Sequence, residues 1–466
     1  MIFTKNKFLI PSKLKKFNEV FKQNNFKAYL VGGAVRDLFL NKKASDFDVA
    51  TNATPQDVIK MFKFVVPTGI EHGTVTVHFM DEEIEVTTFR TESGYSDGRH
   101  PDSVNYATTI QEDLSRRDFT INAIALDLND GKIVDPYKGR KDIKKKIIRT
   151  VGNPHERFME DGLRPVRALR FAGKLGFCIE KKTYSEIFEE NVQKKIASIS
   201  VERFRDELLK LMTAPKPSVG LKLMEESGIF KIFMPELLPC RGCIQKDDRS
   251  YHVFDVMDHC IYACDGAPKE KPLLRLAALL HDAGKPASKT EKNENEFLIY
   301  HFYNHEVYSA ELSQKLMTRL KFSNADIEYV SHLIRCHMFN YTPDWSNAAV
   351  RRFMVKIKIE YLDDLIDLRL ADMYGKYNQD VRKHDSESCR LLIELTKRVR
   401  ELNNESSVLS LKDLQINGDD LIKLGIKPGK QIGLILKDLF EEVLEAPEIN
   451  NKEKLTELVK ERMGLK

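Results

Sequence analysis

The hydrophobic pattern of the chain changes near residue 149, and this change constrains the fold more than any other feature. Before it, short runs with β-branched or alternating residues follow one another between turns. The predicted strands are Phe26–Val31, Phe47–Ala50, Thr74–Phe79, Glu83–Phe89 and Ile121–Leu128. After Arg149 apolar residues recur at helical spacing, and a strand pattern returns only at Phe297–Tyr300. The sequence therefore predicts an α+β protein, in which an all-helical region follows a mixed α/β head.

Breaks in the helical pattern predict the domain boundaries. They fall at 213–218, 234–245 and 403–407, where proline, glycine or polar residues interrupt the pattern. We expect a mixed head, a helical neck and body, a further helical domain and a helical tail. Their predicted bounds are 1–145, 146–250, 251–380 and 381–466.

Composition excludes several classes of protein. The chain has 466 residues, of which 42% are hydrophobic and 31% charged, so it can bury several cores and is not a disordered or disulfide-stapled chain. Seven cysteines, an odd number, indicate reduced thiols. Cys240, Cys243, Cys260 and Cys264 could instead be drawn as a zinc site, although buried thiols are common core residues.

No segment of the sequence has the pattern of a secretory signal or a membrane span. The basic segment 1–17 has Phe8-Leu9-Ile10 as its longest apolar run, too short for a secretory signal. No apolar run reaches the length of a membrane span. We therefore expect a cytoplasmic protein without a membrane partner. Its net charge is only +4, so any polyanion must be held by local basic patches.

A glycine pair predicts a phosphate-binding turn in the head. Gly32 and Gly33 join the strand-like Ala28–Val31 to a helix-like segment. Without side chains there, backbone N–H groups at the start of a helix can approach an anion.

Three carboxylates lie on the predicted strands that follow. Asp46 and Asp48 are two residues apart, so on a strand their side chains share a face. Glu85 is the natural third carboxylate, although an exposed strand face also explains it. Paired carboxylates hold divalent cations, and such a pair beside a phosphate-binding turn is what two-metal nucleotidyl transfer requires.

Further motifs follow in a fixed order. They are Gly32-Gly-Ala-Val-Arg36-Asp37 with Asp46-Phe-Asp48, Arg116-Arg117-Asp118-Phe-Thr-Ile-Asn122, Asp135-Pro-Tyr-Lys-Gly139-Arg-Lys-Asp142, and Glu160-Asp161-Gly-Leu-Arg164-Pro-Val-Arg167. In order and spacing they resemble the class II tRNA nucleotidyltransferase and bacterial poly(A) polymerase family. The resemblance implies a polymerase-beta-like head in which Asp46, Asp48 and Glu85 are catalytic and the two aspartates hold Mg²⁺. The implied nucleotide contacts are Gly32, Gly33, Arg36, Arg117, Asp118, Asn122, Asp161, Arg164, Arg167 and Arg170.

Asp161 and Arg164 indicate how a protein could select the base. Three residues apart on a helix, they would share a face and present an acceptor beside a donor. Cytosine and adenine both offer an amino donor beside a ring-nitrogen acceptor, and uracil and guanine reverse this order. We expect the pair to accept C and A, with an ordinary surface ion pair as the alternative. Asn153 and Pro154 should begin the helix, and Pro165 inside it should bend the axis.

Histidines gather in the predicted domain 251–380. His281-Asp282 follows an apolar helical run, and His259 and Asp372 fall on separate helix-like segments. The set resembles the HD metal-dependent phosphohydrolase family. The resemblance implies His259, His281, Asp282 and Asp372 as ligands of a divalent transition metal or Mg²⁺. It further implies accessory contacts from Lys285, His305 and His337. A degenerate structural domain is the alternative.

Other segments resemble the same nucleotidyltransferase family. Thr91–Pro101 predicts a mobile loop, which in the family is associated with the switch from adding C to adding A. Arg203 and Lys210 lie near the family's RNA-binding region, or on a solvated helix face. The tail at 414–433, with Gly425 between two helices, could meet a tRNA backbone.

The sequence as a whole predicts an enzyme that adds C, C and A to tRNA from CTP and ATP without a template, with a second hydrolytic activity in its HD domain. Alternatives are an enzyme that adds only A or only C, or a poly(A) polymerase. A further alternative is an HD phosphohydrolase whose head binds RNA. The expected partners are tRNA, CTP and ATP, with a homodimer as a possible assembly.

Overall fold

The computed structural model describes most of the chain. The described residues are 10–42, 47–93, 103–245, 253–294, 297–380, 386–405 and 410–464. They form two compact units, Met1–Pro235 and Glu236–Lys466, whose boundary falls in the predicted break at 234–245. Asp46 and residues 94–101 of the predicted loop lie outside the described residues.

A mixed sheet organises the first unit. Among the described residues its order is β3-β4-β5-β2-β1-β8-β9. The strands are β1 (Ala28–Val31), β2 (Phe47–Thr51), β3 (Val65–Gly69), β4 (Thr74–Phe79), β5 (Glu82–Thr88), β8 (Ala125–Asp127) and β9 (Ile133–Val134). Strand β1 is antiparallel to β2 and β8, and β2 is parallel to β5. The predicted strands are confirmed, but β1 begins at Ala28 and Thr120–Asn122 forms a 3-10 turn before β8, so the first and last strands are shorter than expected.

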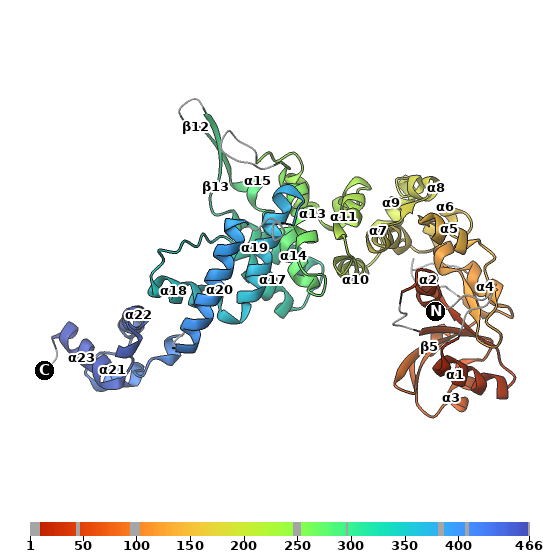
Figure 1. The fold of residues 1–466 in the computed structure, drawn as a ribbon, viewed down its shortest axis with the longest axis horizontal. Coiled ribbons are helices and arrows are strands. Elements are labelled where there is room, and N and C mark those ends of the chain that lie inside the picture. The colour runs from red at the N-terminus through yellow and green to blue at the C-terminus, as the bar shows by residue number, and fades with distance from the viewer. Residues whose placement is uncertain are drawn as a thin grey trace. The chain divides into compact units, whose positions relative to one another are not determined.

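Short helices cover the sheet. They are α1 (Ser12–Gln23), α2 (Gly32–Phe39), α3 (Pro55–Met61), α4 (Ile110–Ser115) and α5 (Gly139–Lys145). Figure 1 shows α1 and α3 on one side of β5 and α2 on the other. Helix α1 packs through Phe17 and Phe21, whose rings contact Phe62, and Phe17 also contacts Phe79 of β4. The first three residues of the predicted loop, 91–93, lie in a strand instead, β6 (Arg90–Ser93), which pairs with β7 (Ser103–Tyr106) beyond the loop.

A helical region completes the first unit. Its helices are α6 (Pro154–Glu160), α7 (Leu163–Leu175), α8 (Lys181–Glu186), α9 (Glu190–Ala197), α10 (Val201–Met212), α11 (Pro217–Glu226) and α12 (Ile229–Phe233). Two short strands, β10 (Ile147–Ile148) and β11 (Cys178–Ile179), pair beside them. Helices α7 and α11 approach closely, because a Cβ on Gly173 would lie 3.2 Å from the backbone nitrogen of Gly220.

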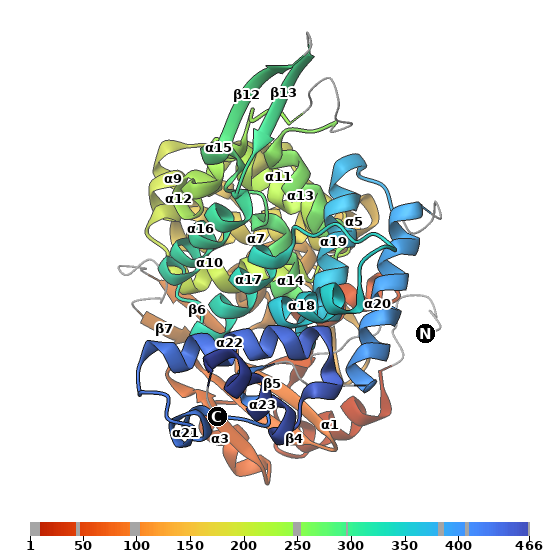
Figure 2. The same cartoon turned by 90° about the vertical axis from the view of Figure 1, so that its left-hand side faces the viewer.

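The second unit is almost wholly helical. Its helices are α13 (Val256–Gly266), α14 (Pro272–Leu280), α15 (Lys285–Ser288), α16 (His305–Arg319), α17 (Asn324–Cys336), α18 (Asn347–Ile357), α19 (Leu362–Tyr377), α20 (Glu387–Glu405), α21 (Gly418–Lys423), α22 (Lys430–Glu445) and α23 (Lys452–Met463). A hairpin of β12 (Lys289–Glu294) and β13 (Phe297–Phe302) follows α15 in the chain and extends beyond the helices of this unit, as Figure 2 shows. The strand predicted at Phe297–Tyr300 is confirmed and is two residues longer. The predicted α+β architecture is confirmed.

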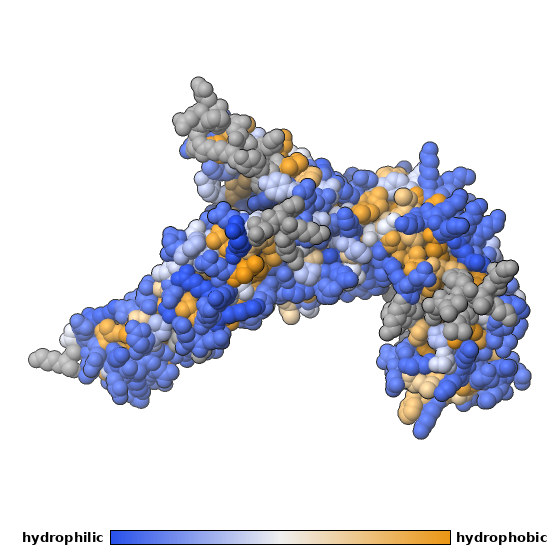
Figure 3. All heavy atoms as spheres, in the orientation of Figure 1, coloured by the Kyte–Doolittle hydropathy of each residue, from blue (hydrophilic) through white to orange (hydrophobic). Residues whose placement is uncertain are grey.

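The tail folds around its own small core. Leu421, Leu439, Val443 and Leu455 are buried there, and the predicted break at Gly425 separates α21 from α22. Over the described part of the chain, no helix combines the length and the apolar character needed to cross a membrane. Figure 3 shows a largely hydrophilic face with scattered hydrophobic patches, one of them over α19 and α20.

Candidate active site and metal-binding cluster

The predicted nucleotide-binding residues line one cleft in the first unit. The cleft has a volume of about 640 Å³. The predicted residues that line it are Gly32, Gly33, Arg36, Asp48, Glu85, Arg117, Asp118, Asn122, Asp161, Arg164, Arg167 and Arg170. They come from the sheet, from the first turns of α2, from the segment after α4, from the turn before α7 and from α7 itself, which are far apart in the sequence. The structure thus brings together every predicted member of this set except Asp46, which lies outside the described residues.

Two carboxylates and the glycine turn meet in this cleft. Asp48 of β2 pairs with Glu85 of β5 in parallel register, so both side chains leave the same face of the sheet. On its other side Asp48 pairs with Val31, the residue before the turn. Gly32 has φ 69°, and a Cβ on it would lie 3.1 Å from Asp48 Oδ2 and 3.2 Å from Arg117 Nη1. Glycine therefore allows the turn to approach both charged groups.

Asp118 anchors a buried network on one wall of the cleft. Arg167 donates from Nε and Nη2 to Asp118 Oδ2 at 2.9 and 2.6 Å. Asn122 donates to Asp118 Oδ1 at 3.0 Å, and Arg36 donates to Asn122 at 2.8 Å. Burial alone would raise the pKa of Asp118, but the Arg167 guanidinium and these hydrogen bonds outweigh burial and hold the pKa at about 2. Asp118 is therefore ionised at neutral pH and fixes the side chains around it.

Asp113 forms ion pairs with two further arginines of the cleft, Arg116 and Arg117. Arg117 donates from Nη2 to Asp113 Oδ2 at 3.1 Å, and Arg116 donates to Oδ1 at 2.7 Å. Burial would raise the pKa of Asp113, but the two guanidinium groups lower it overall. Both arginines line the cleft, so Asp113 orients positive charge where a triphosphate would need it.

The expectation that Asp161 and Arg164 share one helix is wrong. Helix α6 ends at Glu160 and α7 begins at Leu163, and Asp161 has extended backbone angles between them. Gly162 is the N-cap of α7, and Asp161, the residue before it, accepts at Oδ1 from the N–H of Leu163, the first helical residue, at 2.9 Å. Both side chains nevertheless line the cleft, so the turn, and not a shared helix face, brings them together.

The break between α6 and α7 removes the reason for the bend expected at Pro165. Pro165 is the third residue of α7, a position whose N–H would have no partner within the helix. The Asp161 carbonyl accepts from the N–H of Arg164 at 3.0 Å, so it is not left free. The predicted start of α6 is confirmed, with Asn153 as cap and Pro154 as first residue.

Residues outside the predicted nucleotide set also face the cleft. Arg203 and Lys210 of α10 line it, and Lys174 of α7 does so too. Glu207 supports this wall, because it pairs with Arg170 and lies 3.9 Å from Arg167. A sequence signal for Glu207 existed, since it falls on the apolar face of α10 with Phe204 and Leu211, where a lone carboxylate needs a partner.

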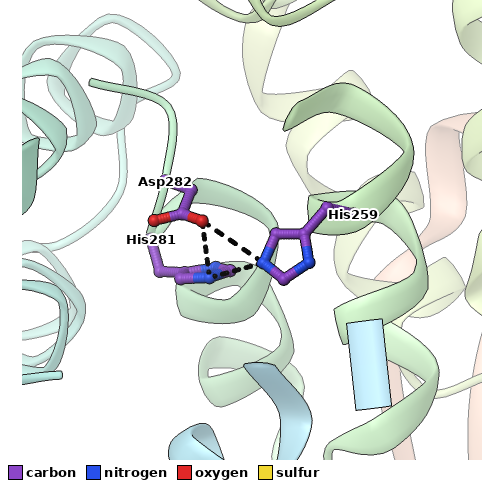
Figure 4. Close-up of side chains that lie close together, drawn as sticks. All are labelled: His259, His281 and Asp282. Atoms are coloured by element: carbon purple, nitrogen blue, oxygen red, sulfur yellow. Dashed lines mark hydrogen bonds and ion pairs between the residues drawn. The ribbon is translucent and has the colours of Figure 1, made fainter. Parts of the chain in front are cut away.

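The predicted histidines and aspartates of the second unit form a buried cluster. Nε2 of His259 lies 3.1 Å from Nε2 of His281, and these atoms lie 3.2 and 3.3 Å from Asp282 Oδ2 (Figure 4). Asp372 Oδ1 lies 3.4 Å from His259 Nε2. On the other side of Asp282, Oδ1 lies 3.2 Å from His305 Nε2 and 3.8 Å from His337 Nε2. These side chains come from five helices or their ends, namely α13, α14, α16, α17 and α19.

Backbone carbonyls fix the orientation of three of these rings. Nδ1 of His281 lies 2.8 Å from the Ala278 carbonyl oxygen, and Nδ1 of His337 lies 2.6 Å from that of Ile334. His305 Nδ1 is bonded in the same way to Phe302. Since a carbonyl only accepts, each Nδ1 donates, which leaves Nε2 as the ring nitrogen that faces Asp282 and that would bind a metal in the neutral form of the ring. Such Nε2 atoms beside carboxylate oxygens suit a divalent metal ion.

The charges of the cluster are strongly coupled. Burial would raise the pKa of Asp282, but His281 and Lys285, whose Nζ lies 2.6 Å away, hold it well below its usual value. Burial lowers the pKa of His337 to about 3, assisted by His281, so His337 is neutral at physiological pH. A neutral imidazole is the form that binds metal.

The cysteines considered for a zinc site are buried thiols. None of the four forms a disulfide, and burial raises the pKa of each thiol. They are Cys240, Cys243, Cys260 and Cys264. Among the described residues, the groups whose ligand atoms converge are the histidine and aspartate sets, and these cysteines are not part of them.

The fold and the cleft define the first unit as a nucleotidyltransferase head. Three family models match the chain and agree with this class. Residues 28–149 match the poly(A) polymerase head domain, 176–240 an RNA- and SrmB-binding site of polymerase A, and 292–459 the tRNA nucleotidyltransferase domain 2.

Whole-chain relatives define the family. The CCA-adding enzyme of Lactobacillus johnsonii is 33% identical over 96% of this chain and 95% of its own length. That of Enterococcus faecalis is 34% identical over 97% of both chains. The crystal structure of the Bacillus stearothermophilus CCA-adding enzyme in complex with CTP has a TM-score of 0.72 and 27% identity, covering 98% of this chain and 100% of that chain. The chain belongs to the family of CCA-adding enzymes.

Proposed function

We propose that this chain adds C, C and A to the 3′ end of tRNA from CTP and ATP, without a nucleic-acid template. One observation carries the proposal: Asp48 and Glu85 share a cleft with Asp161 and Arg164, so a single nucleoside triphosphate can meet the carboxylates and the base-reading pair together. Membership of the family, and the CTP complex of the Bacillus stearothermophilus enzyme, support this reading.

The chemistry assigned to the cleft is phosphoryl transfer. The terminal hydroxyl of tRNA would lose its proton to solvent as it attacks the α-phosphate, the bond from the α-phosphorus to the bridging oxygen would break, and pyrophosphate would leave. Arg117 and Arg36 would hold triphosphate oxygens, while Asp118 fixes Arg167 and Asn122 beside them.

The carboxylates of the cleft fit a magnesium ion. Asp48 and Glu85 offer hard oxygen ligands on one face of the sheet, next to a turn that can approach a phosphate, and we propose that Asp46 joins them. Mg²⁺ bound there would make the attacking hydroxyl more acidic and neutralise charge on the phosphates. The chain itself supplies the spacing of the ligands and the arginines opposite them.

Product sequencing tests the proposal. Incubated with tRNA that ends before CCA, the chain should add two C residues with CTP alone and the complete CCA with CTP and ATP. UTP and GTP should give no extension. Addition of A only to tRNA that already ends in CC would identify an A-adding enzyme, and arrest after CC with both nucleotides would identify a CC-adding one. Long A tails on unrelated RNA would identify a poly(A) polymerase.

The histidine cluster supports a second candidate function, hydrolysis of a phosphoester by a divalent metal site. His259, His281, Asp282 and Asp372 would hold the ion, with His305 and His337 on the other oxygen of Asp282. Lys285, held between Asp282 and Gln245 at 2.6 Å from each, would place positive charge beside the bound phosphate.

The two candidate activities can be separated by substitution. Release of p-nitrophenol from a p-nitrophenyl phosphoester should be lost in His281→Ala and kept in Asp48→Ala. Release equal in wild type and His281→Ala would refute the hydrolytic site and leave a structural domain. If only hydrolysis were found, the head would be an RNA-binding module.

The remaining expectations from the sequence stay proposals. They are the domain bounds 1–145, 146–250, 251–380 and 381–466, the homodimer and the cytoplasmic location. Binding of tRNA by the body and tail belongs with them.

A further inference from the structure

We propose that Arg203 determines base specificity by holding Asp161 in the one orientation that leaves a single hydrogen-bond acceptor facing the cleft. The proposal rests on the function proposed above, because it concerns the same base-reading pair. It makes Arg203 a positioning residue that acts on the base through Asp161.

Asp161 receives a two-pronged contact from Arg203. Nη1 of Arg203 donates to Oδ1 at 3.0 Å and Nη2 donates to Oδ2 at 2.8 Å. This geometry fixes the plane of the carboxylate, which a single bond would leave free to rotate. Arg203 belongs to α10 and Asp161 to the turn before α7, so the contact joins two elements that both reach the cleft.

The acceptor positions of Asp161 can be counted. An ionised carboxylate has about four lone-pair positions, two on each oxygen. Oδ1 uses both, for Arg203 and for the N–H of Leu163 at 2.9 Å, and Oδ2 uses one for Arg203. One position on Oδ2 is left without a partner among the described residues, and Asp161 lines the cleft.

A single open acceptor suits the exocyclic amino group of cytosine or adenine. Uracil and guanine present a carbonyl oxygen at the corresponding position, and two acceptors facing each other without a proton are strongly disfavoured. A carboxylate free to rotate could turn away or admit a bridging water, and discrimination would then weaken.

Arg164 is held from the other side and completes the pair. Its Nη1 donates to Glu160 and to the Arg157 carbonyl, and its Nη2 donates to the Arg116 carbonyl at 3.0 Å. These contacts do not involve Arg203. Loss of Arg203 should therefore disturb the acceptor of the pair and leave its donor in place.

Arg203→Lys is the direct test, because lysine keeps the charge but cannot make the two parallel bonds. We expect the ratio of kcat/KM for CTP to that for UTP to fall at least tenfold, and the ATP to GTP ratio to fall with it. Arg149→Lys is the matched control, since Arg149 likewise donates from two guanidinium nitrogens to carboxylates, those of Asp142 and Glu180, but is not part of the cleft lining. It should keep both ratios.

Unchanged ratios in Arg203→Lys, or an equal loss of rate with all four nucleotides, would overturn the proposal. If Arg203→Lys shows no cooperative thermal transition, Arg203→Gln supplies the same comparison, and loss of folding in both would make Arg203 a structural residue and also overturn it. Failure of the wild-type chain to add C or A would refute the proposed function instead, so the two failures are distinguishable.

Discussion

Asp48 and Glu85 sit opposite each other on parallel strands, in paired register, with their side chains on the same face of the sheet. Sequence separates them by a helix and two strands, and β2 and β5 become neighbours only in the folded sheet. The pair is the part of the cleft best suited to a divalent cation, and it leads to the first prediction.

Glu85→Gln should raise the Mg²⁺ concentration needed for half-maximal nucleotide incorporation, because an amide binds the ion less strongly than a carboxylate. We expect an increase of about tenfold or more, with much of the rate recovered at high Mg²⁺. Glu83→Gln is the control on the same strand and face, where the side chain pairs with His78 instead. An unchanged Mg²⁺ dependence in Glu85→Gln would show that Glu85 is only an exposed strand residue.

Gly32→Ala should reduce incorporation at least tenfold. The new Cβ would press on the Asp48 carboxylate and the Arg117 guanidinium, and φ of 69° disfavours any side chain. Gly152→Ala separates these effects, since Gly152 has φ 72° but nothing within 4 Å of its Cβ position. Steady-state rates and melting temperatures should show both variants slightly destabilised and reduced incorporation in Gly32→Ala alone. Equal incorporation by the two variants would show that the close approach of Gly32 to Asp48 and Arg117 is not needed for activity.

Asp118→Asn should lower the free energy of unfolding by about 2 kcal/mol at neutral pH, because folding lowers the pKa of Asp118 from 3.8 to about 2. The pKa is lower in the folded state, so the ionised carboxylate stabilises the fold fully above pH 3.8. That stabilisation disappears as the pH falls toward 2. Denaturant unfolding at pH 7 and pH 3 measures it, and the difference between variant and wild type should shrink at the lower pH. Asp206→Asn, at an exposed ion pair, should change stability by less than about 1 kcal/mol. A difference independent of pH would contradict the assigned charge state.

His281→Ala should abolish tight metal binding in the second unit. The variant removes an Nε2 that faces both Asp282 and Asp372. After loading with Mn²⁺ or Ni²⁺ and dialysis, elemental analysis of the full-length chain should find the ion in wild type and at least tenfold less in the variant. His301→Ala, on the hairpin, should retain it. Equal metal content in wild type and His281→Ala would contradict the site.

The sequence predicted the carboxylate face because its signal is local. Side chains alternate between the two faces of a strand, and the segment after the glycine turn is short and has a clear hydrophobic pattern, so Asp48 could be placed beside Gly32. The histidine cluster was predictable for a different reason, since the resemblance supplied the distant members that no spacing connects. In both cases the structure brings together those grouped residues that it describes, and Asp46 lies outside them.

The errors arose where tertiary contacts decide the local structure. Asp161-Gly162 interrupts what the pattern suggested was one helix, and the interruption is stabilised by Arg203, 42 residues after Asp161 in the chain. A Cβ on Gly162 would lie 2.4 Å from the Lys195 carbonyl oxygen of α9, so the turn is shaped by a close contact that spacing cannot reveal. The partnership of Glu207 with Arg170 is likewise a contact between helices.

The most direct test of the central claim compares Asp48→Ala with wild type on tRNA lacking CCA, measuring nucleotide incorporation and tRNA binding in the same preparation. Asp48 lines the cleft beside Gly32, so its loss should remove the ion-binding chemistry without altering the helices expected to hold tRNA. We predict incorporation reduced at least a thousandfold and a dissociation constant for tRNA within about threefold of wild type. Incorporation of C and A at the wild-type rate by Asp48→Ala would contradict the account.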